Sequence, residues 1–234
     1  MQTVNSADNP RATYYLASAS GIAAVALNVL AVFLLAELPH AYKVNALREW
    51  LKESMTHPSE TGWSAWAFTL GVLLLAPFAY GLHHRLRHKG SGLTAIAAIF
   101  VSLAGVMNAA GTLTPFVLVR HVLPNYEGQL PSCEPIAFAL LGFTLSMDAL
   151  FNVLFGAGMI LFGFALFKQP HSKFWLGAFG IVAGLSALPI VLQAHSVFFA
   201  NFLIVAGPLW LFWVSAVSIW LMIEAERSHQ SAGV

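Results

Sequence analysis

The chain alternates long apolar stretches with short polar segments. Six stretches are long enough to cross a membrane, because a helix needs about 20 apolar residues to span the hydrocarbon. They cover residues 14–38, 63–82, 92–118, 135–167, 174–193 and 197–223. Runs such as Leu70-Gly71-Val72-Leu73 do not alternate apolar with polar residues, as the strands of a transmembrane β-barrel would. The pattern therefore predicts an all-α, polytopic integral membrane protein with a bundle of six transmembrane helices.

Composition supports this fold class and excludes several others. Of the 234 residues, 58% are hydrophobic and only 9% are charged, too few to cover the surface of a water-soluble domain. The formal net charge of +1 excludes a nucleic-acid partner, because such domains gather many Lys and Arg residues on one face. The expected partners are the lipid bilayer, an apolar small molecule or other membrane-protein subunits.

The distribution of basic residues predicts the orientation. We expect one membrane domain, residues 14–225, between tails at 1–13 and 226–234, and six spans put both tails on the same side. That side would carry Arg11, Arg85, Arg87, Lys89, Lys168, Lys173 and Arg227, whereas the other would carry Lys43, Arg48, Lys52 and Arg120. Because cytoplasmic loops are enriched in Lys and Arg, both termini are predicted to be cytoplasmic in a multi-pass protein of the cell membrane.

Some segments should depart from a simple bundle. Residues 44–55 have helical amphipathic spacing and predict a short helix on the outer surface. The fourth apolar run, of about 33 residues, would extend roughly 50 Å, so it must tilt, protrude or break, with residues 146–148 as the natural break. Gly177, Gly180 and Gly184 predict a close helix contact in the fifth span. Kinks are expected at the prolines inside spans, Pro77, Pro115, Pro189 and Pro208.

Asp148 is the ionisable residue that lies far from both ends of a predicted span. Asn152 follows one helical turn later on the same face, and Asn28 and Asn108 lie at comparable depth in the first and third spans. A carboxylate at that depth costs several kcal/mol unless it is protonated, solvated or paired. Two roles stay open for Asp148: a functional group, or a protonated side chain that bonds to Asn108 or Asn28 and specifies helix packing.

A second polar group is expected at the outer ends of the spans. These residues could converge on one outward-facing cavity, or they are interfacial residues that contact headgroups and water. The members are Glu37, His40, Arg120, His121, Gln193, His195 and Asn201. A haem held by His121 and His195 is an alternative, but nothing in the spacing of these histidines distinguishes them from the others, and the sequence indicates no particular cofactor.

No motif points to a defined reaction. The one histidine cluster, His83, His84 and His88, lies among arginines on a short connection, where a headgroup contact is favoured over a metal. No metal site is therefore predicted, and no nucleophile motif or phosphate-binding glycine loop is present.

Two classes of function follow from these residues. In the first, the outer half of the bundle binds a lipid-like or quinone-like molecule, with Asp148 and Asn152 as its polar floor and His121 and His195 as its rim, and Asn108 and Asn28 are further candidate ligand-binding residues. In the second, the protein is an accessory or scaffold subunit whose buried polar groups only specify packing. A membrane-embedded enzyme or a transporter is a third alternative.

The layout also resembles a bacterial family of six-helix membrane proteins catalogued as domain of unknown function 4386. The resemblance rests on Arg11-Ala12 before a span of small residues, on the long fourth helix and on the segment from Phe174 to Gly184. The amphipathic segment at 44–55 and the basic histidine-rich connection depart from that family. The resemblance implies topology and a bacterial origin, and it implies no activity or site residue.

Overall fold

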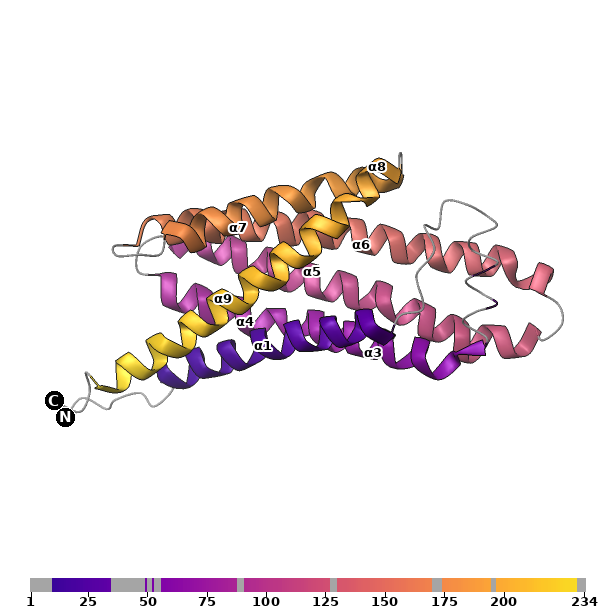
Figure 1. Cartoon of the computed structure of the whole chain (residues 1–234), viewed down its shortest axis with the longest axis horizontal. Helices are drawn as coiled ribbons and strands as arrows, with labels where there is room; N and C mark the ends of the chain where they lie inside the picture. Colours follow the sequence, from indigo (N-terminus) through magenta and orange to yellow (C-terminus); the bar gives the residue numbers. More distant parts are fainter. Residues whose placement is uncertain are drawn as a thin grey trace.

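The computed structural model describes residues 10–34, 49, 52, 56–87, 91–126, 130–169, 174–194 and 197–230. These residues are almost entirely helical, and six helical segments are long and apolar enough to cross a membrane. The segments are Pro10–Leu34, Pro58–Leu86, Ser91–Val122, Cys133–Phe167, Phe174–Leu192 and Phe202–Arg227. The prediction of an all-α bundle with six membrane-spanning helices is confirmed (Figure 1).

Several spans are built from more than one helical element. Three of them are single α-helices in the described part of the chain: α1 (Pro10–Leu34), α6 (Leu130–Phe167) and α9 (Phe202–Gln230). The other spans and the connections between them are α3 (Pro58–Leu73), α4 (Leu75–Leu86), α5 (Ser91–Val117), η2 (Leu118–Val122), η3 (Leu123–Tyr126), α7 (Phe174–Ala187), η4 (Leu188–Ala194) and α8 (Val197–Ala200).

The spans form a ring that follows their order along the chain. α1 packs on α3 and α4, these pack on α5, and α5, α6, α7 and α9 follow in turn. α9 closes the ring by packing on α1. Short connections favour this order, because they join antiparallel neighbours. The first turn of α1 and the last turn of α9 consequently lie at the same end of the bundle (Figure 1).

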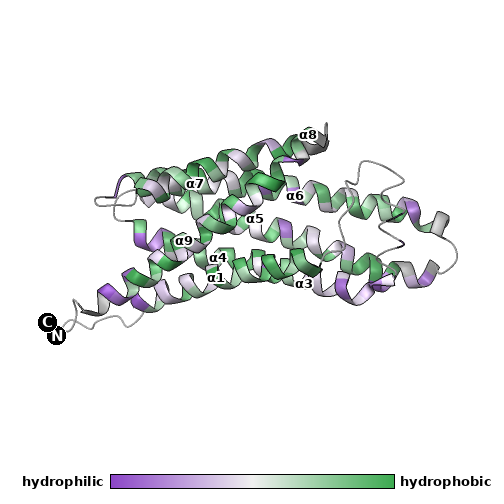
Figure 2. Ribbon diagram, viewed as in Figure 1, coloured by the Kyte–Doolittle hydropathy of each residue, from purple (hydrophilic) through white to green (hydrophobic). Residues whose placement is uncertain are grey.

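Large side chains fill the middle of the ring. Trp213 of α9 is fully buried, lies edge-on to Phe78 of α4 with ring centroids 6.2 Å apart, and donates from Nε1 to the Leu176 carbonyl at 3.0 Å. Phe155 and Phe162 of α6 are buried in the same core. Many large apolar side chains are exposed on the outside of the spans, and hydrophilic residues lie mainly toward the ends of the bundle (Figure 2). Since a lipid-facing surface must be apolar, this distribution is that of a membrane bundle.

Prolines accompany an interruption of the α-helix or a change of helix type at three of the four predicted positions. The second span is interrupted at Leu74, just before Pro77, so that the proline lies in the first turn of α4, where no backbone N–H is needed. After Pro115 the third span turns into the π-helix η2, and Pro189 lies in the 3₁₀-helix η4 that follows α7. α9 continues as an α-helix through Pro208.

The fourth span is longer than predicted and does not break. α6 runs without interruption from Leu130 to Phe167, a length of 38 residues, so the proposed break at residues 146–148 is absent. It begins before the predicted start because Pro131 suits the first turn of a helix. α5 and α6 extend beyond α1, α7 and α9 at the end of the bundle opposite the termini (Figure 1). The excess length is therefore accommodated by protrusion.

Glycines on α6 and α7 bring the fourth and fifth spans into close contact. An added Cβ at Gly156 would lie 2.8 Å from the Gly184 carbonyl oxygen, and one at Gly163 would lie 2.7 Å from that of Gly177. Gly180 lies against the indole of Trp213 instead. The predicted close contact of the fifth span is confirmed. The amphipathic helix predicted at residues 44–55 lies almost entirely outside the described residues.

Candidate functional site

Asp148 lies in the middle of α6 and is half-buried. Asn152, one turn further along the same helix, is 4% exposed, and its Nδ2 donates to the main-chain carbonyl of Asp148 at 2.8 Å. This bond satisfies one amide hydrogen inside the helix itself. The second amide hydrogen and the carbonyl oxygen of Asn152 can still donate and accept beside the Asp148 carboxyl.

The packing register brings Asn108 of α5 level with these two residues. Gly158 of α6 lies against Val101 of α5, and Gly111 of α5 lies against Met147 of α6. Because the two helices are antiparallel, residue 108 is level with residues 148–152. Asn108 is 9% exposed. Three polar side chains from two neighbouring helices therefore share one level within an apolar bundle.

Asn28, the fourth predicted member, is separated from this group. It lies on α1 and is 3% exposed, its Nδ2 donates to the Ala24 carbonyl at 2.8 Å, and its amide packs on Gly71 of α3. α1 does not neighbour α6 in the ring. Its depth is comparable with that of Asn108, as predicted, because Gly105 of α5 contacts Val72, next to Gly71. The structure assigns Asn28 to the α1–α3 contact.

Aromatic rings lie on the turns of α6 that follow Asp148. Phe151 and Phe155 stack with centroids 5.1 Å apart, and Phe155 meets Trp210 of α9 edge-on at 5.5 Å. Both phenylalanines are less than 5% exposed. Together the three rings form a layer across the bundle, which we call the aromatic floor. Phe151 lies at the polar level itself, and Phe155, with Trp210 against it, lies one turn closer to the end of the bundle that carries the termini.

The α-helix of the fifth span ends near the same level. Gly156 of α6 contacts Gly184, Ala187 and Leu188, so the turns of α6 before Gly156 face the 3₁₀-helix η4 rather than α7. Asp148 lies two turns before Gly156. A carboxyl and two amides above aromatic rings can hydrogen-bond a polar head group while an apolar group packs on the rings.

The predicted rim of outer polar residues is described only in part. Arg120 and His121 of η2 and Asn201 are exposed, and the imidazole of His121 lies edge-on to Phe116 at 6.2 Å. Glu37, His40 and His195 lie outside the described residues, as does the side chain of Gln193. Within the described part of the chain no group of three or more His, Cys, Asp or Glu residues could hold a metal ion.

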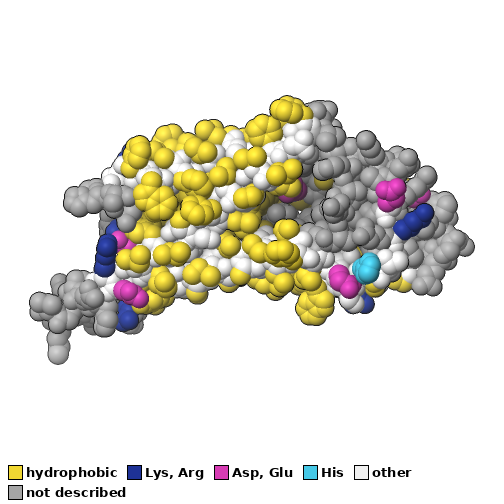
Figure 3. Space-filling view, viewed as in Figure 1, with side chains coloured by type: hydrophobic (Ala, Val, Ile, Leu, Met, Phe, Trp, Pro, Cys, Tyr) yellow, Lys and Arg dark blue, Asp and Glu magenta, His cyan; other side chains and the backbone are white. Residues whose placement is uncertain are grey.

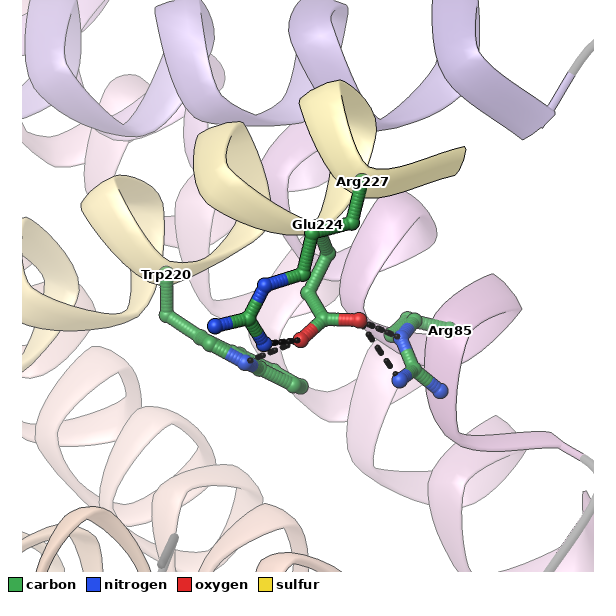
Figure 4. Close-up of polar contacts among 4 residues, drawn as sticks. All are labelled: Arg85, Trp220, Glu224 and Arg227. Atoms are coloured by element: carbon green, nitrogen blue, oxygen red, sulfur yellow. Dashed lines mark hydrogen bonds and ion pairs between the residues drawn. The ribbon is translucent and has the colours of Figure 1, made fainter. Parts of the chain in front are cut away.

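A polar cluster at the opposite end of the bundle escaped the sequence reasoning. Glu224 of α9 accepts hydrogen bonds at Oε2 from Arg85 of α4, and at Oε1 from Trp220 and Arg227 (Figure 4). Arg85 also lies over the Trp220 ring, with its guanidinium carbon 5.7 Å from the centroid. The four residues, Arg85, Trp220, Glu224 and Arg227, are called the Glu224 cluster below. The one available signal was an acidic residue in the last turns of a span, opposite a basic connection.

Two histidines of that connection, His83 and His84, pack against neighbouring helices instead of forming the predicted headgroup contact. α4 continues to Leu86, so His83 and His84 belong to a packed helix. His84 is 5% exposed and lies edge-on to Tyr14 of α1 at 5.8 Å. The Nδ1 of His83 lies 2.8 Å from the hydroxyl of Thr94 on α5. His88 lies outside the described residues.

Comparison with known proteins adds no relative to this geometry. No protein family matches the chain, and neither a curated protein nor a solved structure is significantly similar to it. The resemblance to the family of unknown function stays a prediction, and the functional conclusion rests on the two polar groups described above.

Proposed function

We propose that this integral membrane protein binds one amphipathic molecule of the lipid or quinone class in the half of the bundle opposite the termini. The observation that carries the proposal is one level of the bundle where a half-buried carboxyl, Asp148, lies level with two buried amides, Asn108 and Asn152. Polar groups inside a membrane are expensive and are retained where they bind, relay protons or specify packing.

The surroundings of this level suit an amphipathic ligand. The aromatic floor offers ring faces and edges to an aromatic or quinoid head group. The amides can donate to its carbonyl oxygens, and a protonated Asp148 can donate as well. An apolar tail would follow the lipid-facing side of α6, where Phe143 and Leu150 are exposed by 45% and 44%. Such pockets commonly combine an apolar lining with a few polar groups that orient the ligand.

The proposal includes an orientation. The end that carries the termini holds Arg11, Arg85, Arg87, Lys168 and Arg227 among the described residues. By the positive-inside rule this end faces the cytoplasm, so the binding level lies in the half of the bundle toward the outer leaflet. Accessibility labelling of a cysteine placed at residue 88 tests this part, and labelling from outside by an impermeant reagent would contradict it.

An accessory subunit is the second candidate. Asn28 and Asn152 each use an amide hydrogen on a carbonyl of their own helix, and Asn28 packs on Gly71. Such bonds satisfy an amide hydrogen inside its own helix, so these side chains can pack between spans without a ligand. Under this proposal the exposed apolar faces of the bundle contact other membrane subunits.

Native mass spectrometry of the full chain, purified in a mild detergent, separates the two candidates. Wild type should retain one apolar molecule, and Asp148→Leu and Asn108→Leu should each lose it. Ser146→Leu is the matched control, because Ser146 lies on the same helix but is exposed to lipid. A wild-type protein that never retains such a molecule contradicts ligand binding and favours the accessory subunit.

A further inference from the structure

Positive charge gathers at the end of the bundle that carries the termini. Five basic side chains, Arg11, Arg85, Arg87, Lys168 and Arg227, stand there against two acidic ones, Glu224 and Glu226, among the described residues. Lys and Arg side chains lie at this end, just beyond the apolar belt of the spans (Figure 3). The local excess of basic groups is three, although the net charge of the chain is +1.

The Glu224 cluster holds two of these guanidinium groups in defined positions. Oε2 of Glu224 accepts from Nη2 and Nε of Arg85 at 2.8 Å and 3.3 Å, and Oε1 accepts from Nη1 of Arg227 at 3.4 Å. The indole Nε1 of Trp220 donates to Oε1 at 3.2 Å. One carboxylate therefore orients two cations.

The two guanidinium groups of the Glu224 cluster are accessible from outside the bundle. The side chain of Arg227 is 65% exposed, and that of Arg85 is 30% exposed. Both can therefore meet a group that arrives from the headgroup region.

The chemistry of this arrangement matches a phosphodiester. Guanidinium groups bind phosphate oxygens in pairs, and these charge-assisted bonds are stronger than neutral ones. Apolar side chains on the membrane side of the cluster are exposed to lipid: Leu16 of α1 by 62%, Tyr80 of α4 by 59% and Ile223 of α9 by 41%. A phosphate that carries acyl chains can therefore use both surfaces, whereas a free phosphate uses only the first.

We infer that Arg85 and Arg227 form a binding site for the phosphodiester headgroup of an anionic membrane lipid, with Glu224 as a positioning residue. Basic sites between spans on the cytoplasmic side are known to take anionic headgroups. This site lies at the opposite end of the bundle from Asp148, and it does not depend on the function proposed above.

The test measures lipid binding by the full chain. Purified protein is titrated with phosphatidylglycerol or phosphatidylcholine and analysed by native mass spectrometry. Wild type should prefer phosphatidylglycerol, and Arg227→Gln should weaken that binding about tenfold, the effect of one lost charge-assisted hydrogen bond. Lys168→Gln is the matched control, because it removes one charge at the same end from another helix, and it should bind as wild type does.

Other outcomes would overturn the inference. Equal binding of the two lipids by wild type would exclude headgroup recognition, and equal losses in both variants would indicate diffuse surface charge. If inorganic phosphate raises the melting temperature of wild type as much as phosphatidylglycerol does, and not that of Arg227→Gln, the ligand is free phosphate rather than a lipid. The double variant Arg85→Gln/Glu224→Gln removes both charges of the Arg85–Glu224 ion pair, and Arg227, which also contacts Glu224, is 65% exposed. The double variant should fold and lose the lipid preference, and an intact preference would contradict the site.

Discussion

Arg85 of α4 and Glu224 of α9 are joined by two hydrogen bonds, 2.8 Å and 3.3 Å long, across the end of the ring that carries the termini. α1 packs on both of these helices and lies between them in ring order. The ion pair therefore connects the second span directly to the sixth, which are 139 residues apart at this point. It adds to the packing of α9 on α1, which closes the ring.

Glu224→Ala should destabilise the bundle by about 1–3 kcal/mol, because it leaves the half-buried guanidinium of Arg85 without its acceptor. Unfolding in detergent, followed by circular dichroism, measures the change. Glu226→Ala is the control, since Glu226 is exposed two residues later, and it should alter stability by less than about 0.5 kcal/mol. Equal stability of the two variants would contradict a contribution of this ion pair to the ring.

Gly156→Ala should destabilise the protein by about 1–3 kcal/mol, the usual cost of overpacking a close contact. The added Cβ would lie 2.8 Å from the Gly184 carbonyl oxygen. Because this atom belongs to the backbone of α7, it cannot move away as the end of a flexible side chain could. Gly142→Ala is a control on the same helix, because its Cβ meets nothing within 4 Å. That variant should be neutral or more stable, since Ala favours helix over Gly. The contact between α6 and α7 is refuted if both variants melt alike.

Trp213→Phe should cost about 1–3 kcal/mol. It removes the hydrogen bond from Nε1 to the Leu176 carbonyl, and the smaller ring leaves a gap beside Gly180 in the core. Trp175→Phe is the matched substitution at a position that is 52% exposed, and it should change the melting temperature little. A Trp213 variant as stable as the Trp175 variant would mean that the indole bond contributes nothing to the ring.

The class of the protein and the number of its spans could be predicted because they depend on one dominant effect. Apolar stretches of sufficient length must be helical in lipid, and this holds without knowledge of tertiary contacts. The effects of prolines and glycines could also be predicted, because each acts locally. Pro77 indicated the interruption of the second span, and Gly184 indicated the close contact of the fifth span. The fourth span was predicted to begin at residue 135, whereas α6 begins at Leu130, because a proline such as Pro131 can stand in a first helical turn as well as in a loop.

The candidate sites were predictable only in part. Asp148 and Asn152 are one turn apart, so their proximity follows from helix geometry. Asn108 lies on a helix next to α6 and at the same level as these residues, whereas Asn28 lies on a helix that does not neighbour α6. Ring order and register decide this, and the periodicity of one sequence does not reveal either of them. The Glu224 cluster was missed for the same reason: Arg85 and Glu224 come from the second and sixth spans, and only the closure of the ring brings them together.

Asp148 provides the sharpest test of the polar level. Asp148→Asn keeps a donor and an acceptor but cannot ionise, whereas Asp148→Leu removes both. If the role is packing, Asp148→Asn should melt like wild type. Asp148→Leu should then lower the free energy of unfolding by about 1–2 kcal/mol, the scale of interhelical hydrogen bonds in membranes. If the role is ligand binding, both variants should lose the retained molecule in native mass spectra, even where Asn melts normally. Ser146→Leu controls for an added leucine on the same helix. A Leu variant that equals wild type in both melting and retained ligand would contradict both roles and leave the half-buried carboxyl facing water.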